Sequence, residues 1–258
     1  MGSPVTASGA WVIDLDGVLW LAGHEIPGSG DAVDKLRRHG TPLLFATNNA
    51  DPTLSDLAAR LDRIGIRSGP HELVTSAEAA AAMVEPDARV LACGGPGLVE
   101  ALTARGATVV ETGPADAVVV GMTRDFDYGL LTRAELAVRG GARLIGTNED
   151  PTHPTPEGLL PGSGALVAAV ATAAQQDAVW AGKPHRPMME LIRSRAPRID
   201  RVVGDRPATD GRLARALGVR YSLVLSGVTG IGHGPLEVEP DDEVDDLATL
   251  VAQAGIGN

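Results

Sequence analysis

Two carboxylates near the start of the sequence stand one residue apart, directly after an apolar run. Residues 11–13 predict a buried strand, which should end at Asp14, Asp16 and Gly17 because Asp and Gly are poor strand formers. Acids this close repel each other unless a cation or a proton lies between them. A metal-assisted site is one interpretation of this pair, and the start of an ordinary loop is the other.

Two further predicted strands end in polar residues that suit the same chemistry. Apolar runs at 42–46 and 201–203 each predict a strand. In open parallel α/β sheets, ligands collect at the carboxyl ends of strands, where hydroxyls and amides can donate to phosphate oxygens. A turn with a helix cap is the alternative for the Thr-Asn-Asn segment. The polar residues are Thr47, Asn48 and Asn49 after the first run, and Asp205 and Asp210 after the second.

A lysine in a loop has two interpretations as well. Lys183 lies between Gly182 and Pro184, shortly before the last of these strands. Most lysines are solvated at the surface, and this is the simpler interpretation. The alternative is that the ammonium group binds an anionic ligand beside the carboxylates.

The elements that would position these residues alternate between strand and helix. A helix predicted at 31–38 joins the first two strands with the crossover length of a parallel pair. From residue 75 the alternation restarts, which looks like a second α/β unit inserted between parts of the first. We expect a helix at 208–217 and the last strand at 221–225. The acidic run 237–246 is most simply a solvated loop before a final helix.

Composition and charge exclude several functions. The chain has 258 residues, a net charge of −11 and 44% hydrophobic residues, which supports a buried core and argues against a nucleic-acid-binding surface. Cys93 is the only cysteine, so no intrachain disulfide can form. No apolar segment approaches the ~20 residues of a membrane span, and no signal peptide is evident. We therefore expect a cytoplasmic protein without nucleic-acid or membrane partners.

Four groups of these residues, in order along the chain, resemble the motifs of a known enzyme family. They are similar to those of the haloacid dehalogenase (HAD) superfamily, in its phosphatase branch. The Thr-Asn-Asn form and the long insertion resemble the subgroup of NagD-like, p-nitrophenyl phosphatase and phosphoglycolate phosphatase proteins. In that subgroup Ile usually follows the last Asp, whereas Gly211 stands here and predicts a looser helix start. The groups are Asp14-Leu15-Asp16-Gly17-Val18, Thr47-Asn48-Asn49, Gly182-Lys183-Pro184 and Gly204-Asp205-Arg206 with Thr209-Asp210.

The resemblance implies a fold and a domain organisation. The fold class is α/β, with a Rossmann-like parallel-sheet HAD core formed by residues 1–76 and 182–258. Residues 77–181 would form an inserted α/β cap domain, which resembles a mobile C2-type cap that closes over the site and selects the leaving group. Similar caps often carry dimer contacts, so the resemblance makes a homodimer through the cap possible and leaves the oligomeric state open.

The resemblance also implies a mechanism. The protein would be an Mg²⁺-dependent hydrolase of a small phosphorylated metabolite, working through an aspartyl phosphate. Asp14 would be the nucleophile and Asp16 the general acid and base. The implied metal ligands are Asp14, the backbone carbonyl of Asp16, Asp205 and, through water, Asp210; the implied phosphate and substrate contacts are Gly17, Thr47, Asn48, Asn49 and Lys183, with Asn148 and Asp150 from the insertion.

Other functions stay open at this point. A receiver-like switch protein also phosphorylates an Asp on an α/β scaffold, although receivers are single compact domains. A carboxylate at Asp16 is compatible with a phosphomutase as well as with a phosphatase. A dinucleotide site at 94–97 is less favoured, because these glycines lack the full spacing and Pro96 has no amide N–H. Candidate substrates include phosphoglycolate, glycerol phosphate, sugar phosphates, nucleoside monophosphates and pyridoxal phosphate.

Overall fold

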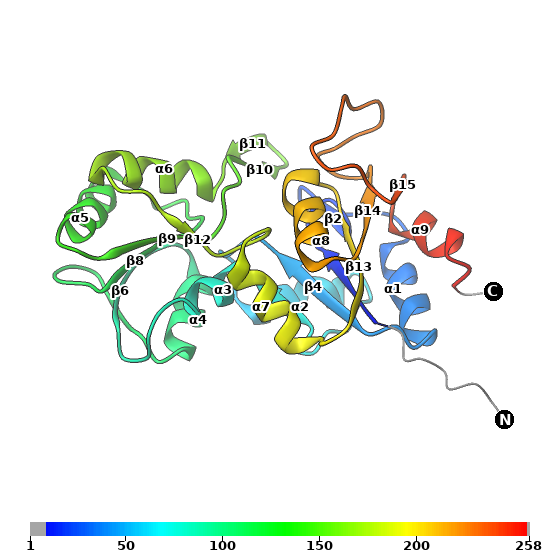
Figure 1. The fold of residues 1–258 in the computed structure, drawn as a ribbon, viewed down its shortest axis with the longest axis horizontal. Helices are drawn as coiled ribbons and strands as arrows, with labels where there is room; N and C mark the ends of the chain where they lie inside the picture. The colour runs from blue at the N-terminus through cyan, green and yellow to red at the C-terminus, as the bar shows by residue number, and fades with distance from the viewer. Residues whose placement is uncertain (1–8, 257–258) are drawn as a thin grey trace. The chain divides into compact units, whose positions relative to one another are not determined.

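The computed structural model describes residues 9–256, which divide into two compact units (Figure 1). Within the described residues, the first unit comprises 9–46, 61–72 and 192–256, and the second comprises 47–60 and 73–191. Two helices, α2 (Leu54–Arg63) and α7 (Arg186–Arg195), contain residues of both units. No helix within 9–256 is both long enough and apolar enough to span a membrane.

A parallel sheet with the strand order β15-β14-β13-β1-β4 forms the centre of the first unit. Both β1 and β4 are buried along their whole length, as is typical of parallel strands that are covered on both faces. Helix α1 packs against α9. The elements of this unit are β1 (Ala10–Asp14), β2 (Trp20–Leu21), β3 (His24–Glu25), α1 (Ser29–Arg38), β4 (Leu43–Thr47), β13 (Ile199–Gly204), α8 (Arg212–Leu217), β14 (Arg220–Val224), β15 (Asp242–Val244) and α9 (Leu247–Gln253).

The second unit has its own parallel sheet, with the strand order β12-β9-β8-β6-β7. Helices α5 and α6 pack against each other and share an apolar core with the strands, to which Val118, Val138 and Val170 belong. The antiparallel pair β10–β11 is separate from this sheet. The elements are β5 (Leu73–Thr75), α3 (Ser76–Ala81), β6 (Arg89–Cys93), α4 (Pro96–Ala104), β7 (Thr108–Val110), β8 (Ala117–Val120), α5 (Tyr128–Arg139), β9 (Arg143–Gly146), β10 (Thr152–Thr155), β11 (Gly158–Pro161), α6 (Ser163–Ala174) and β12 (Val179–Trp180).

The predicted α/β fold class is confirmed, and the division into a core and an inserted cap stays a prediction. The five-stranded sheet of the second unit lies wholly within residues 77–181. Residues 47–60 nevertheless group with it, because Gly97 N–H donates to Asp51 O at 2.8 Å and Leu54 N–H donates to the Glu100 carboxylate at 3.1 Å. Residues 1–8 and 257–258 of the predicted core, and the start of the chain on which the signal-peptide prediction rests, lie outside the described residues.

The prediction that the acidic run 237–246 is a loop is wrong in part, because the run contains strand β15, which pairs with β14. Asp242 explains why so acidic a segment pairs with the sheet. Its carboxylate accepts hydrogen bonds from Arg201 at 2.5 Å, Arg220 at 2.8 Å and Ser222 at 3.0 Å. Two arginines on neighbouring strands therefore compensate the charge that made this segment look solvated. The predicted last strand, 221–225, is the last but one.

The helix predicted at 208–217 is also interrupted. A π-helical turn occupies Pro207–Gly211, and the regular helix α8 begins only at Arg212. A Cβ on Gly211 would lie 3.0 Å from both the Tyr221 ring and Val238, so a larger side chain here would require its neighbours to shift. The turn before it is not loose, because Asp210 is fully buried.

Asp242 gives the first unit a testable pH dependence. Burial alone would raise the pKa of Asp242, but the hydrogen bond from Ser222 and the Arg201 guanidinium outweigh burial and lower it. A lowered folded-state pKa stabilises the protein at neutral pH and loses that contribution as the pH falls through the folded-state pKa. We expect Asp242→Asn to lower the free energy of unfolding by about 1.5–3 kcal/mol at pH 7, the range for hydrogen bonds to charged groups.

Urea unfolding of the wild type and Asp242→Asn between pH 7 and pH 3 measures this effect. The difference between the two proteins should shrink towards the acid end. The exposed Asp245 lies three residues further along the chain, and Asp245→Asn serves as the control. A constant difference at all pH values would show that the ionised carboxylate is not the stabilising species.

Candidate active site

The pairing of β1 with its neighbours places Asp14 at the edge of the sheet where the parallel strands end. Ile13 pairs with Val203 of β13, and Asp14 pairs with Ala46 of β4. Asp205 follows the end of β13, and Thr47 follows Ala46 directly in the chain. The carboxyl ends of these adjacent parallel strands therefore carry polar residues, as the sequence predicts: Asp14 is the last residue of β1, Thr47 is the last residue of β4, and Asp205 comes directly after β13.

Three carboxylates of the first unit converge at this edge. One oxygen from each of Asp14, Asp205 and Asp210 lies within 4.8 Å of the others, and the residues are only 8%, 1% and 0% exposed. Among residues 9–256 this is the single group of His, Cys, Asp and Glu side chains that is close enough to share a metal ion. Buried like charges at such distances repel one another strongly. An all-oxygen donor set of this kind fits a hard divalent cation.

The negative charge of this cluster also acts on a neighbouring tyrosine. Tyr221 lies on β14 and is fully buried. Burial, and then the charges of Asp210, Asp205 and Asp14, raise the pKa of its hydroxyl well above the usual value. All three carboxylates therefore lie close enough to one phenol to make its ionisation unfavourable.

The loop after β1 holds Asp16 apart from this carboxylate cluster. The Trp20 indole N–H donates to the Asp16 carboxylate at 2.9 Å. Gly17 N–H donates to Trp20 O at 2.6 Å, and Gly17 has a φ of +87°, which favours glycine. Asp14 itself accepts a hydrogen bond from Leu15 N–H at 2.8 Å. The two acids of the Asp-x-Asp pair therefore occupy different environments.

The second unit places Asn48 at the centre of a hydrogen-bond network. Its amide nitrogen donates to the Asp150 carboxylate at 3.0 Å and to Lys183 O at 3.2 Å, and its amide oxygen accepts from Lys183 N–H at 2.8 Å. Its backbone carbonyl accepts from Ser76 Oγ and from the Asn148 amide, both at 2.6 Å. Four predicted site residues are thus brought together in this unit: Asn48, Asn148, Asp150 and Lys183.

Three of the predicted site side chains are almost completely buried. Lys183 is 2% exposed, so it is not a solvated surface lysine. Asn148 is 3% exposed and also donates to Ser163 Oγ at 3.1 Å. Thr47 is 2% exposed, and its hydroxyl accepts from Asn49 N–H at 3.0 Å. The burial of Lys183 places a positively charged side chain inside this network and not in solvent.

The sequence analysis missed one segment of the first unit that contacts the carboxylate cluster. Val228 N–H donates to the Asp205 carboxylate at 2.6 Å, and Ser226 Oγ donates to Gly17 O at 2.8 Å. A signal was present in the sequence. The run 221–225 ends in Ser226-Gly227, just as the other strands end in small polar residues and glycine.

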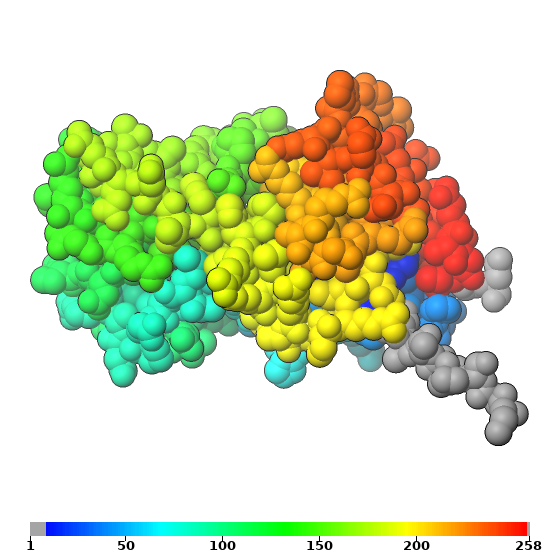
Figure 2. All heavy atoms as spheres, viewed as in Figure 1, coloured from blue at the N-terminus to red at the C-terminus, as the bar shows by residue number. Residues whose placement is uncertain are grey.

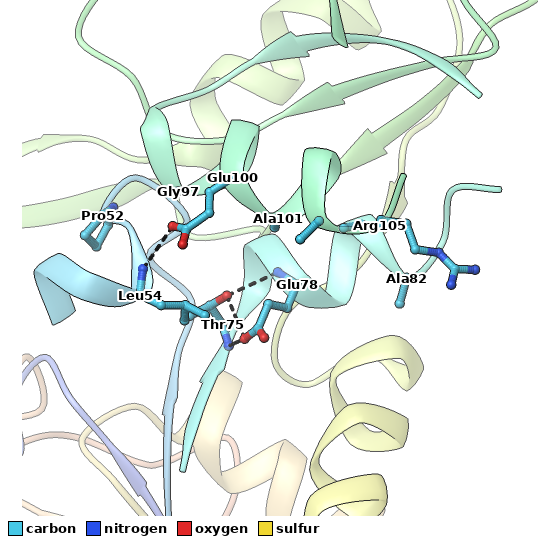
Figure 3. Close-up of a pocket in the computed structure, with 11 residues that line it drawn as sticks. Pro52, Leu54, Thr75, Glu78, Ala82, Gly97, Glu100, Ala101 and Arg105 are labelled. Carbon is cyan, nitrogen blue, oxygen red and sulfur yellow. Dashed lines mark hydrogen bonds between the residues drawn. The ribbon is translucent and has the colours of Figure 1, made fainter. Parts of the chain in front are cut away.

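A pocket elsewhere in the second unit lacks comparable chemistry (Figure 3). It has a volume of about 270 Å³ and is lined mainly by small side chains from α3 and α4. The Glu78 carboxylate accepts from Thr75 at the start of α3, and that of Glu100 accepts from Leu54 N–H. Both acids therefore stabilise helix starts, and the pocket does not contain a group of side chains arranged for catalysis.

Comparisons with known proteins agree with this geometry. The haloacid dehalogenase-like hydrolase model matches residues 11–108, and a second HAD-hydrolase-like model matches residues 180–250. An acid sugar phosphatase of Staphylococcus haemolyticus is 37% identical over 226 residues, which cover 85% of this chain and 86% of that protein.

Two solved structures share the fold over almost the whole chain. The p-nitrophenyl phosphatase from Archaeoglobus fulgidus has a TM-score of 0.87 and 30% identity, and the match covers 95% of this chain and 99% of that one. The glycerol phosphate phosphatase from Mycobacterium tuberculosis in complex with magnesium has a TM-score of 0.85 and 34% identity, covering 97% of this chain and 78% of that one. The family model and a relative that is 37% identical over most of both chains show that the chain belongs to the haloacid dehalogenase-like hydrolase family.

Proposed function

We propose that this protein hydrolyses the phosphomonoester of a small, polar metabolite such as a sugar phosphate or glycerol phosphate. The observation that carries the proposal is the cluster of Asp14, Asp205 and Asp210, buried at the carboxyl edge of a parallel sheet. The acid sugar phosphatase and the glycerol phosphate phosphatase among its relatives support the substrate class.

The residues of the cluster fit a magnesium ion. Mg²⁺ prefers oxygen ligands and is usually bound by one or two carboxylates with water, which three clustered carboxylates can satisfy. Asp14, Asp205 and the backbone carbonyl of Asp16 would hold it directly, and Asp210 would act through water. When bound, the ion offsets the repulsion between the carboxylates and the anionic phosphate.

Asp14 and Asp16 divide the chemistry between them. A carboxylate oxygen of Asp14 attacks phosphorus, a P–O bond to Asp14 forms, and the bond to the leaving alkoxide breaks. Asp16, in its protonated form, gives its proton to that alkoxide. In the second step a water attacks the phosphorus of the aspartyl phosphate, Asp16 takes the proton of that water, and the P–O bond to Asp14 breaks. This releases inorganic phosphate, restores the Asp14 carboxylate and returns Asp16 to its protonated form. The separate environment of Asp16, with the Trp20 N–H on its carboxylate, supports its distinct role.

The remaining predicted residues would bind the phosphate and the rest of the substrate. Hydrogen-bond donors and positive charge stabilise the charge that builds on the transferred phosphoryl group. The positions of Thr47 at the carboxyl end of β4 and of Lys183 beside Asn48 support such a role, since one side chain carries a hydroxyl donor and the other a positive charge. The residues proposed for phosphate are Thr47, Lys183, Gly17, Asn48 and Asn49, and those proposed for the rest of the substrate are Asn148 and Asp150. A cytoplasmic location and a homodimer through residues 77–181 stay predictions of the same proposal.

Removal of divalent metal is the first test of this function. After exhaustive treatment with EDTA and exchange into metal-free buffer, we expect turnover of p-nitrophenyl phosphate to fall by about 10²-fold or more, because charge compensation by the ion is worth several kcal/mol. Adding Mg²⁺ back should restore the rate. Full activity in metal-free buffer would contradict the metal assignment.

Substitution of the nucleophile is the second test. Asn has the shape of Asp but cannot attack phosphorus, so Asp14→Asn should lower kcat by roughly 10⁴-fold or more while the protein stays folded. Circular dichroism checks the fold, and steady-state hydrolysis of p-nitrophenyl phosphate measures the rate. Wild-type turnover that stops after one phosphate per protein would instead favour a phospho-acceptor switch.

The third test separates substrate contact from structural support in the second unit. Asp150→Ala should change the ranking of kcat/KM over a panel of phosphomonoesters, with losses of about 10- to 100-fold for substrates that it contacts. Asn148→Ala should also lower the unfolding temperature, because its buried amide joins Asn48 to Ser163. If Asp150→Ala leaves the ranking unchanged, substrate selection must come from other residues.

A further inference from the structure

We infer that the segment Ser226-Gly227-Val228, which follows β14, positions Asp205 for metal binding. The inference rests on the proposed function, since it assigns a role toward the proposed metal ion. It also goes beyond that function, because none of these three residues belongs to the four sequence motifs. We call this segment the Asp205 bracket.

The first contact of the bracket is a backbone hydrogen bond to the carboxylate. Val228 N–H donates to Asp205 Oδ2 at 2.6 Å, and Asp205 is 1% exposed. A short bond between a backbone N–H and a buried carboxylate is charge-assisted, and such bonds are about twice as strong as neutral ones. It therefore restrains the rotation of the Asp205 side chain.

The second contact is steric. A Cβ placed on Gly227 would lie 2.5 Å from the Asp205 Cγ, and one placed on Gly17 would also lie 2.5 Å from the same atom. The carboxylate thus packs directly against two glycines, at positions 17 and 227, and neither can carry a methyl group without moving it. For Gly17 the φ of +87° is a second reason for glycine, whereas Gly227 is not among the residues with positive φ. At position 227, glycine is therefore required by its close approach to Asp205 and not by its backbone conformation.

A third contact ties these two glycine segments together. Ser226 Oγ donates to Gly17 O at 2.8 Å, across 209 positions of the sequence. The residue before it is anchored to the sheet, because Leu225 N–H donates to Val244 O at 2.9 Å. The bracket is therefore attached both to the loop after β1 and to the sheet edge, and Asp205 is enclosed between them.

Metal affinity depends on this kind of support. Mg²⁺ demands nearly ideal octahedral geometry at about 2.0–2.1 Å, so a ligand that shifts by a few tenths of an ångström binds less well. Groups that orient metal ligands typically change the affinity or activity by about 10- to 100-fold when they are replaced. The bracket restrains Asp205 by a hydrogen bond on one oxygen and by packing against its Cγ.

The loop that continues the bracket offers a matched control. Residues 229–237 follow directly and project at the surface of the first unit, in orange in Figure 2. A Cβ on Gly230 would have no atom within 4 Å, and Gly230 does not have a positive φ. Gly227→Ala and Gly230→Ala are therefore the same chemical change, three residues apart, and only the first displaces Asp205.

Magnesium binding by the full-length protein tests the inference without relying on activity. Isothermal titration calorimetry with MgCl₂ should show that Gly227→Ala weakens binding by about 10- to 100-fold, whereas Gly230→Ala binds like the wild type. The Mg²⁺-induced rise in unfolding temperature should shrink in Gly227→Ala alone. Excess Mg²⁺ should recover part of the lost phosphatase activity, which a general loss of structure would not allow.

Ser226→Ala keeps the test decisive if Gly227→Ala does not fold. Loss of the serine hydroxyl frees Gly17 O without adding an atom, so Mg²⁺ binding should weaken in the same direction. Wild-type affinity in Gly227→Ala, or in Ser226→Ala if only that variant folds, would overturn the bracket while the proposed metal site stands. Failure of the wild type to bind Mg²⁺ would overturn the metal site, and the bracket with it.

Discussion

Repulsion between three buried carboxylates is the constraint on which the first unit depends. At separations within 4.8 Å and almost without exposure to water, the charges of Asp14, Asp205 and Asp210 oppose the folded state. Backbone donors offset part of this cost: Leu15 N–H binds Asp14, and Val228 N–H binds Asp205. Such an arrangement is a poor way to stabilise a protein and a good way to bind a divalent cation. Local structure that costs stability in this way is typical of functional sites.

Close packing of backbone around these carboxylates explains the glycines at the strand ends. A Cβ on Gly204 would collide with the Asp210 side chain, and Gly17 and Gly227 both face Asp205. Each glycine lets a main-chain segment pack directly against a carboxylate. At positions 204 and 227 a backbone N–H nearby also donates to it, from Arg206 to Asp210 and from Val228 to Asp205. The glycine at position 211 has a different origin, since Tyr221 and Val238 fill the space beside it.

The sequence predicted the parts of this protein that depend on local pattern. Continuous apolar runs identified β1, β4 and β13, and the acids that follow β1 and β13 converge as expected. Strand β15 was missed because its acidic residues are compensated only by arginines brought near by folding. The Ser226–Gly17 hydrogen bond could not be predicted from the sequence, since the two residues are 209 positions apart, although the strand-end pattern of Ser226-Gly227 was present. Contacts between distant segments depend on tertiary structure, which periodicity does not encode.

The network around Asn48 depends on the one difference between an amide and a carboxylic acid. Within one planar group, the nitrogen donates to Asp150 and to the Lys183 carbonyl while the oxygen accepts from the Lys183 N–H. An ionised aspartate would fill the same volume with two acceptors, and would meet a like charge at Asp150 and a second acceptor at the Lys183 carbonyl. Asparagine and aspartate have nearly the same shape, but only asparagine carries the hydrogens that position 48 needs. An aspartate there would fit the space and still lose the hydrogen bonds that join Asn48 to Asp150 and to the Lys183 carbonyl.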